Sequence, residues 1–364
     1  MNMHIIPGLY FENDKHFLLE NADFAPLDKL YANRKAYYGD FHAHSDSGGT
    51  SDGKMKVESW LRGMKEFKID FIGIMDHRQI RHMYLDCFDP EFLVYGTEPA
   101  GKWNDPFLSF HYIMIVPKRE SIEKVLEQFP DVFGFTGGIE GTFEYRRVDR
   151  DRFLEVVNAV RNEGGVVVHA HPKQVMKSDN PDDYYFGEGS IIETMYTCDP
   201  PSLANDATRD NYKLWMDLLE RGYKVINTAT NDSHRQTMMV ALNTVYSDRK
   251  NGSAYVEYLR KGDLNAGFFG IKMSIDENAV GSTAVYKEGM NLYIKIEDVH
   301  PFRFDREETY RLDVITDKGM AYSEKIELPF KVALKAEKRK FYRAVIIRES
   351  DGAPVAIGNP IWLG

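Results

Sequence analysis

Apolar and polar positions alternate in two different ways along the chain. Between residues 37 and about 265, short apolar runs are followed by stretches in which apolar residues recur at the spacing of an amphipathic helix. One such helical stripe comprises Val57, Trp60, Leu61, Met64 and Phe67. The apolar run IDFIGIMDH comes after it and has the character of a buried strand. This succession of strand and helix predicts β/α units and an α/β fold.

The same pattern returns twice. The later helical stripes comprise Phe153, Val156, Val157 and Val160, and then Tyr212, Trp215, Leu218 and Leu219. Glycines follow both stripes, as expected at helix ends, and the predicted strands VVVHAHP and YKVINTATNDSH come next. Ionisable residues gather at the carboxyl ends of these strands, where α/β barrels carry their active sites.

After about residue 267 the period changes to two. Apolar and polar residues alternate in NLYIKIED, TYRLDVITD and FYRAVIIRESDGAPVAIGNPIWL, which are separated by turn-forming residues. We therefore predict a barrel over residues 37–266 and a small all-β, sandwich-like domain over residues 267–364. Residues 1–36 are less periodic and are expected to form an arm packed on the barrel.

Composition narrows the function classes. The net charge of −10 argues against a surface for sequence-independent nucleic-acid or membrane binding, because both need clustered Lys and Arg. Cys87 and Cys198 are the two cysteines and do not form a CxxC pair, which suits a reducing compartment. The amino-terminal residues lack the pattern of a signal peptide, and no later run approaches eighteen apolar residues. The sequence therefore predicts a cytoplasmic protein with a small-molecule substrate.

Histidines and acids concentrate at the predicted strand ends. The histidines concerned are His42, His44, His77, His111, His169, His171 and His234, and the acids are Asp52, Asp76, Glu98 and Asp232. Residues two apart in a strand point the same way, so His42 and His44 should present two imidazoles to one space. The same reasoning pairs His169 with His171, and Asp232 with His234.

Each of these pieces also has an ordinary structural interpretation. An HxH pair can be a polar strand edge, the DH after a strand can cap a helix, Glu98 can be a surface acid, and His111 can be a core histidine. Imidazoles and carboxylates that converge at five strand ends would, however, be costly without a shared counter-ion. The combined pattern therefore predicts a metal cluster.

The order of the motifs resembles that of the polymerase and histidinol phosphatase (PHP) superfamily of metal-dependent phosphoesterases. The motifs are, in order, DFHAHS…SDG, GIMDHR, GTE, HYIMIV, HAHP and NDSH. The resemblance covers residues 37 to 240. The β tail that ends in GNPIWL resembles a two-domain branch that includes carbaryl-hydrolase-like metallohydrolases. The resemblance implies a distorted (βα)7, TIM-like barrel with two or three divalent metal ions.

Carried over motif by motif, the resemblance implies three ligand sets. They are His42, His44, Glu98 and Asp232 for a first ion; a bridging Glu98 with His111 and His171 for a second; and Asp52, His77 and His234 for a third. His169 has no counterpart, but its strand phase predicts that it faces the same rim as a further ligand or substrate contact. Asp76 is expected to orient a ligating histidine. The loop before Asp52 is longer than usual and contains Gly48 and Gly49, so Asp46 competes with Asp52 for its role.

These ligands predict a metal-dependent hydrolase, a phosphoesterase in which a metal-bound hydroxide attacks a small phosphomonoester or phosphodiester. The leaving group would take its proton from Asp52, His169 or His234, whichever does not ligate. Arg78, Arg81, Lys173 and Arg235 come after motif residues and are candidates for binding phosphate or, equally, for pairing with surface acids. Zinc, manganese and iron all suit such ligands, with zinc favoured by the number of histidines.

Two other functions stay open at this point. The resemblance of the β tail raises an amide, ester or carbamate hydrolase that uses the same metal site. A non-catalytic module that binds a partner or a carbohydrate is the third possibility, although such a module has no need to keep every ligand.

Overall fold

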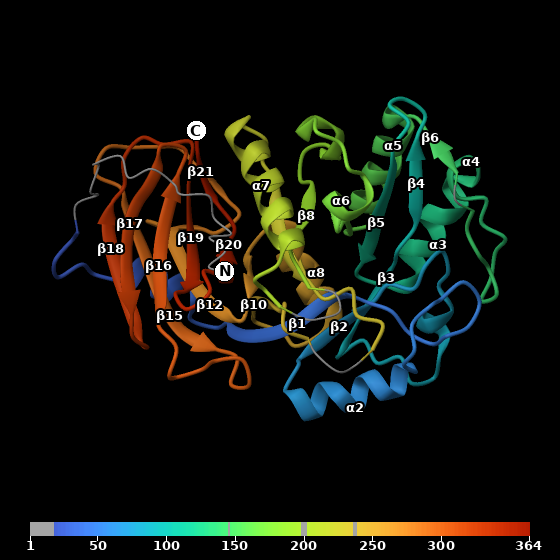
Figure 1. Cartoon of the computed structure of the whole chain (residues 1–364), viewed down its shortest axis with the longest axis horizontal. Coiled ribbons are helices and arrows are strands. Elements are labelled where there is room, and N and C mark those ends of the chain that lie inside the picture. Colours follow the sequence, from blue (N-terminus) through green and yellow to red (C-terminus); the bar gives the residue numbers. More distant parts are fainter. Residues whose placement is uncertain (1–17, 145, 198–201, 236–238) are drawn as a thin grey trace.

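The computed structural model describes residues 18–144, 146–197, 202–235 and 239–364. An α/β part, drawn in blue to yellow, lies beside a β-rich part drawn in orange and red (Figure 1). Helix α7 (Asp206–Glu220) stands between the two parts in this view. The chain therefore has the mixed α/β architecture with a carboxy-terminal β region that the sequence predicts.

Seven strands of the α/β part pair in a ring. They are β1 (Lys35–Ala43), β2 (Phe71–Ile74), β3 (Leu93–Thr97), β5 (Ser109–Val116), β7 (Val166–Ala170), β8 (Ile191–Tyr196) and β9 (Ile226–Thr230). Each strand pairs with the next in this order. A parallel bridge between Ala43 and Ser233 then joins the segment after β9 back to β1, and the His44 amide donates to the Ser233 carbonyl at 2.9 Å.

Strand β5 is the exception to the parallel pairing. It runs antiparallel to both of its neighbours, β3 and β7. Its first residues therefore lie at the same rim as the last residues of the other ring strands, and His111 near the start of β5 pairs with Ala170 at the end of β7. The mixed α/β fold is thus present, but the distorted (βα)7 barrel implied by the resemblance is not confirmed.

The connections between ring strands are also unequal. The longer helices are α2 (Val57–Phe67), α3 (Arg119–Gln128), α5 (Arg150–Asn162) and α7, and the short ones are α4 (Pro130–Phe133), α6 (Pro172–Val175), η1 (Arg81–Tyr84) and η2 (Pro181–Tyr184). The three predicted helical stripes become the buried faces of α2, α5 and α7. A short hairpin strand, β4 (Ala100–Trp103), pairs with β5 and with β6 (Arg147–Val148).

The β region continues the ring's sheet directly. Strand β10 (Asn243–Ser247) pairs with β1, β11 (Leu264–Gly267) with β10, and β20 (Pro354–Gly358) with β11. The other strands are β12 (Phe269–Ile275), β13 (Asn278–Ala279), β14 (Thr283–Ala284), β15 (Asn291–Val299), β16 (Tyr310–Thr316), β17 (Gly319–Ile326), β18 (Phe330–Lys335), β19 (Phe341–Arg348) and β21 (Ile361–Leu363); helix α8 (Gly252–Lys261) precedes β11. One hydrophobic core runs through both parts, so the predicted boundary at residue 267 crosses a continuous sheet.

The described part of the predicted arm packs against both regions of the chain. Helix α1 (Ala25–Tyr31) buries Leu27 and Tyr31 in a small cluster with Tyr246, Tyr293 and Ala333. Tyr246 belongs to β10, within the predicted barrel range, whereas Tyr293 and Ala333 belong to β15 and β18 of the β region. Residues 1–17 lie outside the described residues. None of the helices in the described ranges is both long and apolar enough to cross a membrane.

His300 lies fully buried where the β region meets the ring. Its Nε2 donates to the Lys68 carbonyl at 3.2 Å, and its ring meets Tyr38 edge-on at 5.2 Å. Burial lowers the pKa of His300 from 6.5 to about 4, so the folded protein favours the neutral ring. The resulting stability is complete above pH 6.5 and is lost as the pH falls toward 4.

We therefore expect that acidification from pH 7 to pH 5 removes about 1 to 2 kcal/mol of unfolding free energy through His300 alone. The variant His300→Gln keeps a donor but cannot titrate, so its unfolding free energy should fall less over this pH range. Urea denaturation of both proteins at the two pH values measures the difference, because the other titrating groups contribute equally to both. Equal losses in the two proteins would show that His300 does not protonate on unfolding.

Candidate metal centre

His42 and His44 begin the candidate site. They lie at the end of β1, and both side chains are completely buried. Their Nε2 atoms lie 3.1 Å apart, and each is 3.3 Å from Oε2 of Glu98. Asp232, which comes after β9, places Oδ1 3.0 Å from Nε2 of His44 and 3.4 Å from that of His42. The four donor atoms thus form one compact group.

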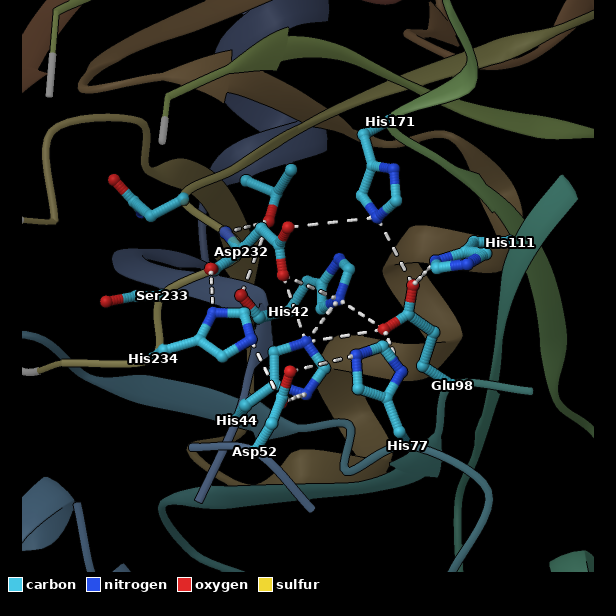
Figure 2. A network of polar contacts seen from close by, with 12 residues as sticks. His42, His44, Asp52, His77, Glu98, His111, His171, Asp232, Ser233 and His234 are labelled. Atoms are coloured by element: carbon cyan, nitrogen blue, oxygen red, sulfur yellow. Dashed lines mark hydrogen bonds and ion pairs between the residues drawn. The ribbon is translucent and has the colours of Figure 1, made fainter. Parts of the chain in front are cut away.

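Glu98 belongs to a second group as well, because its two oxygens face different histidines (Figure 2). Oε2 faces His42 and His44, whereas Oε1 lies 3.0 Å from Nδ1 of His111 and 3.2 Å from Nε2 of His171. Glu98 is itself completely buried. One carboxylate therefore lies between two sets of imidazole nitrogens, an arrangement that an oxygen pair can supply and a single imidazole cannot.

A third group lies on the open side of the cluster. Oδ1 of Asp52 is 3.0 Å from Nε2 of His234, and Oδ2 is 3.7 Å from Nε2 of His77. The exposed fractions of these side chains are 53% for Asp52, 31% for His234 and 21% for His77, against 0% for Glu98. The site therefore opens to solvent beside Asp52. Nδ1 of His44, buried without a hydrogen-bond partner, faces this third group.

The donor set fits divalent cations. The three groups are His42, His44, Glu98 and Asp232; Glu98, His111 and His171; and His44, Asp52, His77 and His234, and in each the donor atoms lie within 4.8 Å of one another. The nine residues predicted as metal ligands thus come together in one place, with Asp52 rather than Asp46 as the loop carboxylate. Mixed imidazole and carboxylate donors at this spacing suit zinc, manganese or iron.

The electrostatics of the cluster agree with that fit. Burial lowers the pKa of His44, but its hydrogen bonds to Asp232 and Glu98 outweigh burial and raise the pKa to about 9. Burial raises the pKa of Glu98, whereas the charges of His42 and His77 and the other histidine contacts lower it well below its usual range. The carboxylates are therefore held ionised, and protons on the imidazoles balance them. A divalent cation would take the place of those protons.

The backbone is strained at three positions around the cluster. His171, Asp232 and Arg78 have φ angles of 26°, 46° and 51°, in the left-handed region that residues with a side chain rarely adopt. Each residue comes after the end of a ring strand. The turn of the backbone at His171 and Asp232 directs their side chains toward the cluster. Such strain persists only where the surroundings enforce it, and it is concentrated at functional sites.

His169 does not join the cluster, contrary to expectation. Its ring stacks on Phe186 at 4.4 Å, its Nδ1 lies 3.3 Å from the Tyr184 carbonyl, and the side chain is completely buried. Burial lowers its pKa to about 3. The expectation assumed that His169 and His171 share a strand phase, but β7 ends at Ala170, and the left-handed turn at His171 breaks that phase. The structure therefore places His169 outside the three groups of candidate ligands.

Asp76 also acts elsewhere than expected. Its carboxylate accepts from the backbone amide and the hydroxyl of Ser45 at 2.6 and 2.7 Å, and it lies 3.2 Å from Nδ1 of His82. Gln79 holds the same loop through the carbonyl of Gly48 at 2.8 Å. Asp76 therefore anchors the loop between His44 and Asp52 rather than a histidine of the cluster.

The four predicted phosphate-binding cations differ in their surroundings. Arg78 is half-buried beside His77 and has no ion pair with a described residue. Arg81 pairs with the exposed Glu140 at 2.5 Å, and Lys173 donates to the Ser178 carbonyl at 2.6 Å. Arg235 is exposed, directly after His234. Among the described residues, neither Arg78 nor Arg235 has an ion pair with a carboxylate, and the backbone amide of Arg78 is bonded to the carbonyl of Glu98.

Two residues of β8 were missed by sequence reasoning. Glu193 is buried with Oε1 2.8 Å from Nδ1 of His42, and its Oε2 accepts from the His171 amide at 2.7 Å. Tyr196 donates its hydroxyl to Oδ2 of Asp232 at 3.1 Å. The signal for Glu193 was present in the sequence, because an acid interrupts the otherwise uncharged strand IIETMY.

No protein-family model and no curated protein matches this sequence. Solved structures give weak similarities: endonuclease Q from Pyrococcus furiosus has 12% identity and a TM-score of 0.43 over 62% of this chain and 56% of that chain. A protein from Bifidobacterium adolescentis assigned as a metal-dependent phosphoesterase has 13% identity and a TM-score of 0.35 over 61% and 94% of the two chains. An amidohydrolase from Chromobacterium violaceum has 12% identity and a TM-score of 0.35 over 54% and 87%. Such scores do not establish a shared activity, and the resemblance to the PHP superfamily remains a prediction from the motifs.

The position of Glu98 predicts the effect of its replacement. Glu98→Gln keeps the size of the side chain but removes the charge that faces two groups of imidazoles, so we expect bound metal to be lost from both groups. The core packing is unchanged, and the variant should still fold. Metal analysis of the purified protein by mass spectrometry, with circular dichroism as the folding check, measures this.

Asp46→Asn is the matched control for Glu98→Gln. Asp46 lies in the loop before Asp52 but is exposed and outside all three groups. We expect this variant to retain its metal. A Glu98→Gln protein with as much metal as the Asp46→Asn protein would refute the bridging position of Glu98.

Proposed function

We propose that this chain is a metal-dependent hydrolase of the PHP type that cleaves a small phosphomonoester or phosphodiester. The proposal rests on one observation: the two carboxylate oxygens of Glu98 face separate groups of histidines. We assign a first ion to His42, His44, Glu98 and Asp232, a second to Glu98, His111 and His171, and a third to Asp52, His77 and His234. Paired divalent ions polarise phosphoryl oxygens and activate water for direct attack.

The chain's own residues supply the remaining requirements. Asp52 and His234 lie on the open side, where a substrate has access. In a centre of two ions they are free to deliver a proton to the leaving oxygen, and in a centre of three ions they hold the third. With either number of ions, hydrolysis would proceed without a covalent intermediate on serine or cysteine.

The surroundings of the cluster favour an anionic substrate. Arg78 comes directly after His77, and its backbone amide donates to the Glu98 carbonyl at 3.1 Å, which fixes the residue at the rim. Its side chain has no ion pair with a described carboxylate. A guanidinium without an ion pair, on the residue that directly follows the candidate ligand His77, is suited to a phosphate oxygen pair. A neutral amide, ester or carbamate carries no charge that this cation could bind in the ground state.

A comparison of substrate classes tests the proposed function. We expect the metal-loaded protein to hydrolyse aryl phosphomonoesters or phosphodiesters, and metal removal with a chelator should abolish this activity. Aryl esters, amides and carbamates should be poor substrates on the same protein. Faster turnover of the carbonyl substrates would overturn the assignment to phosphate esters, and short oligonucleotides in the same panel test whether the phosphodiester can belong to a nucleic acid.

Arg78 should govern the affinity for the phosphate group. A charge-assisted hydrogen bond contributes about 1.5 to 3 kcal/mol, so Arg78→Ala should raise KM roughly tenfold or more. Arg78→Lys keeps the charge without the two-pronged geometry and should recover part of the loss. Lys173→Ala should have a much smaller effect, because its ammonium group is already bonded to the Ser178 carbonyl. Steady-state kinetics of the three variants on one phosphate ester measure these effects. An unchanged KM in Arg78→Ala would exclude a phosphate contact.

A further inference from the structure

Glu193 is a buried carboxylate that belongs to none of the three candidate metal groups. It lies in β8, on the inner side of the ring, with 1% of its surface exposed. Its two oxygens contact two different candidate ligands, the His42 ring and the His171 backbone. A buried carboxylate is costly unless its oxygens have such partners, so its presence requires an explanation.

The contact with His42 fixes the state of that ring. Oε1 of Glu193 lies 2.8 Å from Nδ1 of His42, and a carboxylate oxygen can only accept, so Nδ1 carries the proton. A neutral His42 ring then has its lone pair on Nε2, the atom that faces Glu98 and Asp232. Histidine ligands commonly depend on such a carboxylate for their orientation and tautomer.

The contact of Glu193 with His171 is a hydrogen bond to the backbone amide. The amide of His171 donates to Oε2 of Glu193 at 2.7 Å, at the residue whose φ of 26° breaks the strand phase. This bond holds the strained turn that carries the imidazole back toward Oε1 of Glu98. Without it, an extended backbone would direct the ring away from the cluster, as at His169.

We infer that Glu193 is a positioning residue that presets His42 and His171 for metal binding and thereby joins the first two groups. The two histidines belong to different groups, and Glu193 contacts both, so its loss should weaken both groups together. The third group has no contact with Glu193 and should be spared. This inference rests on the metal-binding half of the proposed function and is independent of the substrate.

Glu193→Gln gives the sharpest test, because glutamine has the same length but one acceptor oxygen for two donors. Titration of metal-free protein with Zn²⁺ or Co²⁺ by equilibrium dialysis should show a roughly ten- to hundredfold weaker affinity for the ions of the first two groups. Glu193→Asp keeps the charge but is one methylene shorter, so it should not restore wild-type affinity. Full recovery by Glu193→Asp would show that charge alone matters and would overturn the positioning role.

Asp313→Asn is the control for loss of a buried carboxylate. Asp313 is 1% exposed, accepts from Arg311 and Ser323 at 2.9 and 2.7 Å, and lies in β16, away from the cluster. This variant should lose stability but keep its metal affinity. Equal metal affinity in Glu193→Gln and the wild type would refute the inference, whereas a wild type that binds no metal would refute the proposed function itself.

The state of the His42 ring in the wild-type protein provides a second test, in which a variant serves only to assign the signals. In metal-loaded protein labelled with ¹⁵N-histidine, His42 should show a protonated Nδ1 and a ligating Nε2. The assignment comes from comparison with His42→Asn. A His42 ring protonated at Nε2 in the loaded protein would overturn the role of Glu193, because such a ring cannot present Nε2 to a metal.

Discussion

The carboxylate of Glu98 lies fully buried among five imidazoles, and the rest of the site is arranged around the need to balance its charge. An isolated carboxylate in this position would cost several kcal/mol. Here Oε2 faces His42, His44 and His77, and Oε1 faces His111 and His171. These histidines come from four different ring strands or their ends, so the balance exists only in the folded chain. The same set of nitrogen and oxygen donors makes the cluster a candidate site for divalent cations.

The ring of strands brings these donors to one rim in two ways. Parallel strands deliver the residues at their carboxyl ends, as β1 does for His42 and His44. Strand β5 runs in the opposite direction and therefore delivers His111 from near its amino end. Left-handed backbone at His171 and Asp232 then directs the side chains of two further candidate ligands toward the same rim. The buried acceptor Glu193 stabilises the turn at His171, so a second layer of polar contacts supports the first.

The β region takes part in this arrangement through its contacts with the ring. Asn359, which comes after β20, accepts from the backbone amide of Asn227 in β9 at 2.7 Å, and its own amide donates to the Leu264 carbonyl at 3.3 Å. Arg343 of β19 is completely buried against Tyr212 and Trp215 of α7, with its guanidinium 5.1 and 5.0 Å from their rings. Strand β9 leads to Asp232, and α7 leads into β9. The carboxy-terminal strands therefore brace the segment that supplies one of the candidate ligands.

Local pattern in the sequence was sufficient for the elements and for the residue types of the site. The apolar stripes specify α2, α5 and α7, and the period-two runs specify the carboxy-terminal strands, because both depend on which side chains neighbours along the chain bury. The clustering of histidines and acids at predicted strand ends indicated metal chemistry, because the strand ends could be located from the same local pattern. The alternation of side chains along a strand, however, predicted that His169 and His171 face the same rim. This prediction was wrong because the left-handed backbone at His171 ends the alternation, so the two side chains point in different directions. The direction of β5, the place of Glu193 between His42 and His171, and the pairing of β11 with β20 depend on contacts between residues distant in sequence. Only the tertiary structure decides these, because hydrogen bonding and burial between distant segments leave no periodic trace in the chain.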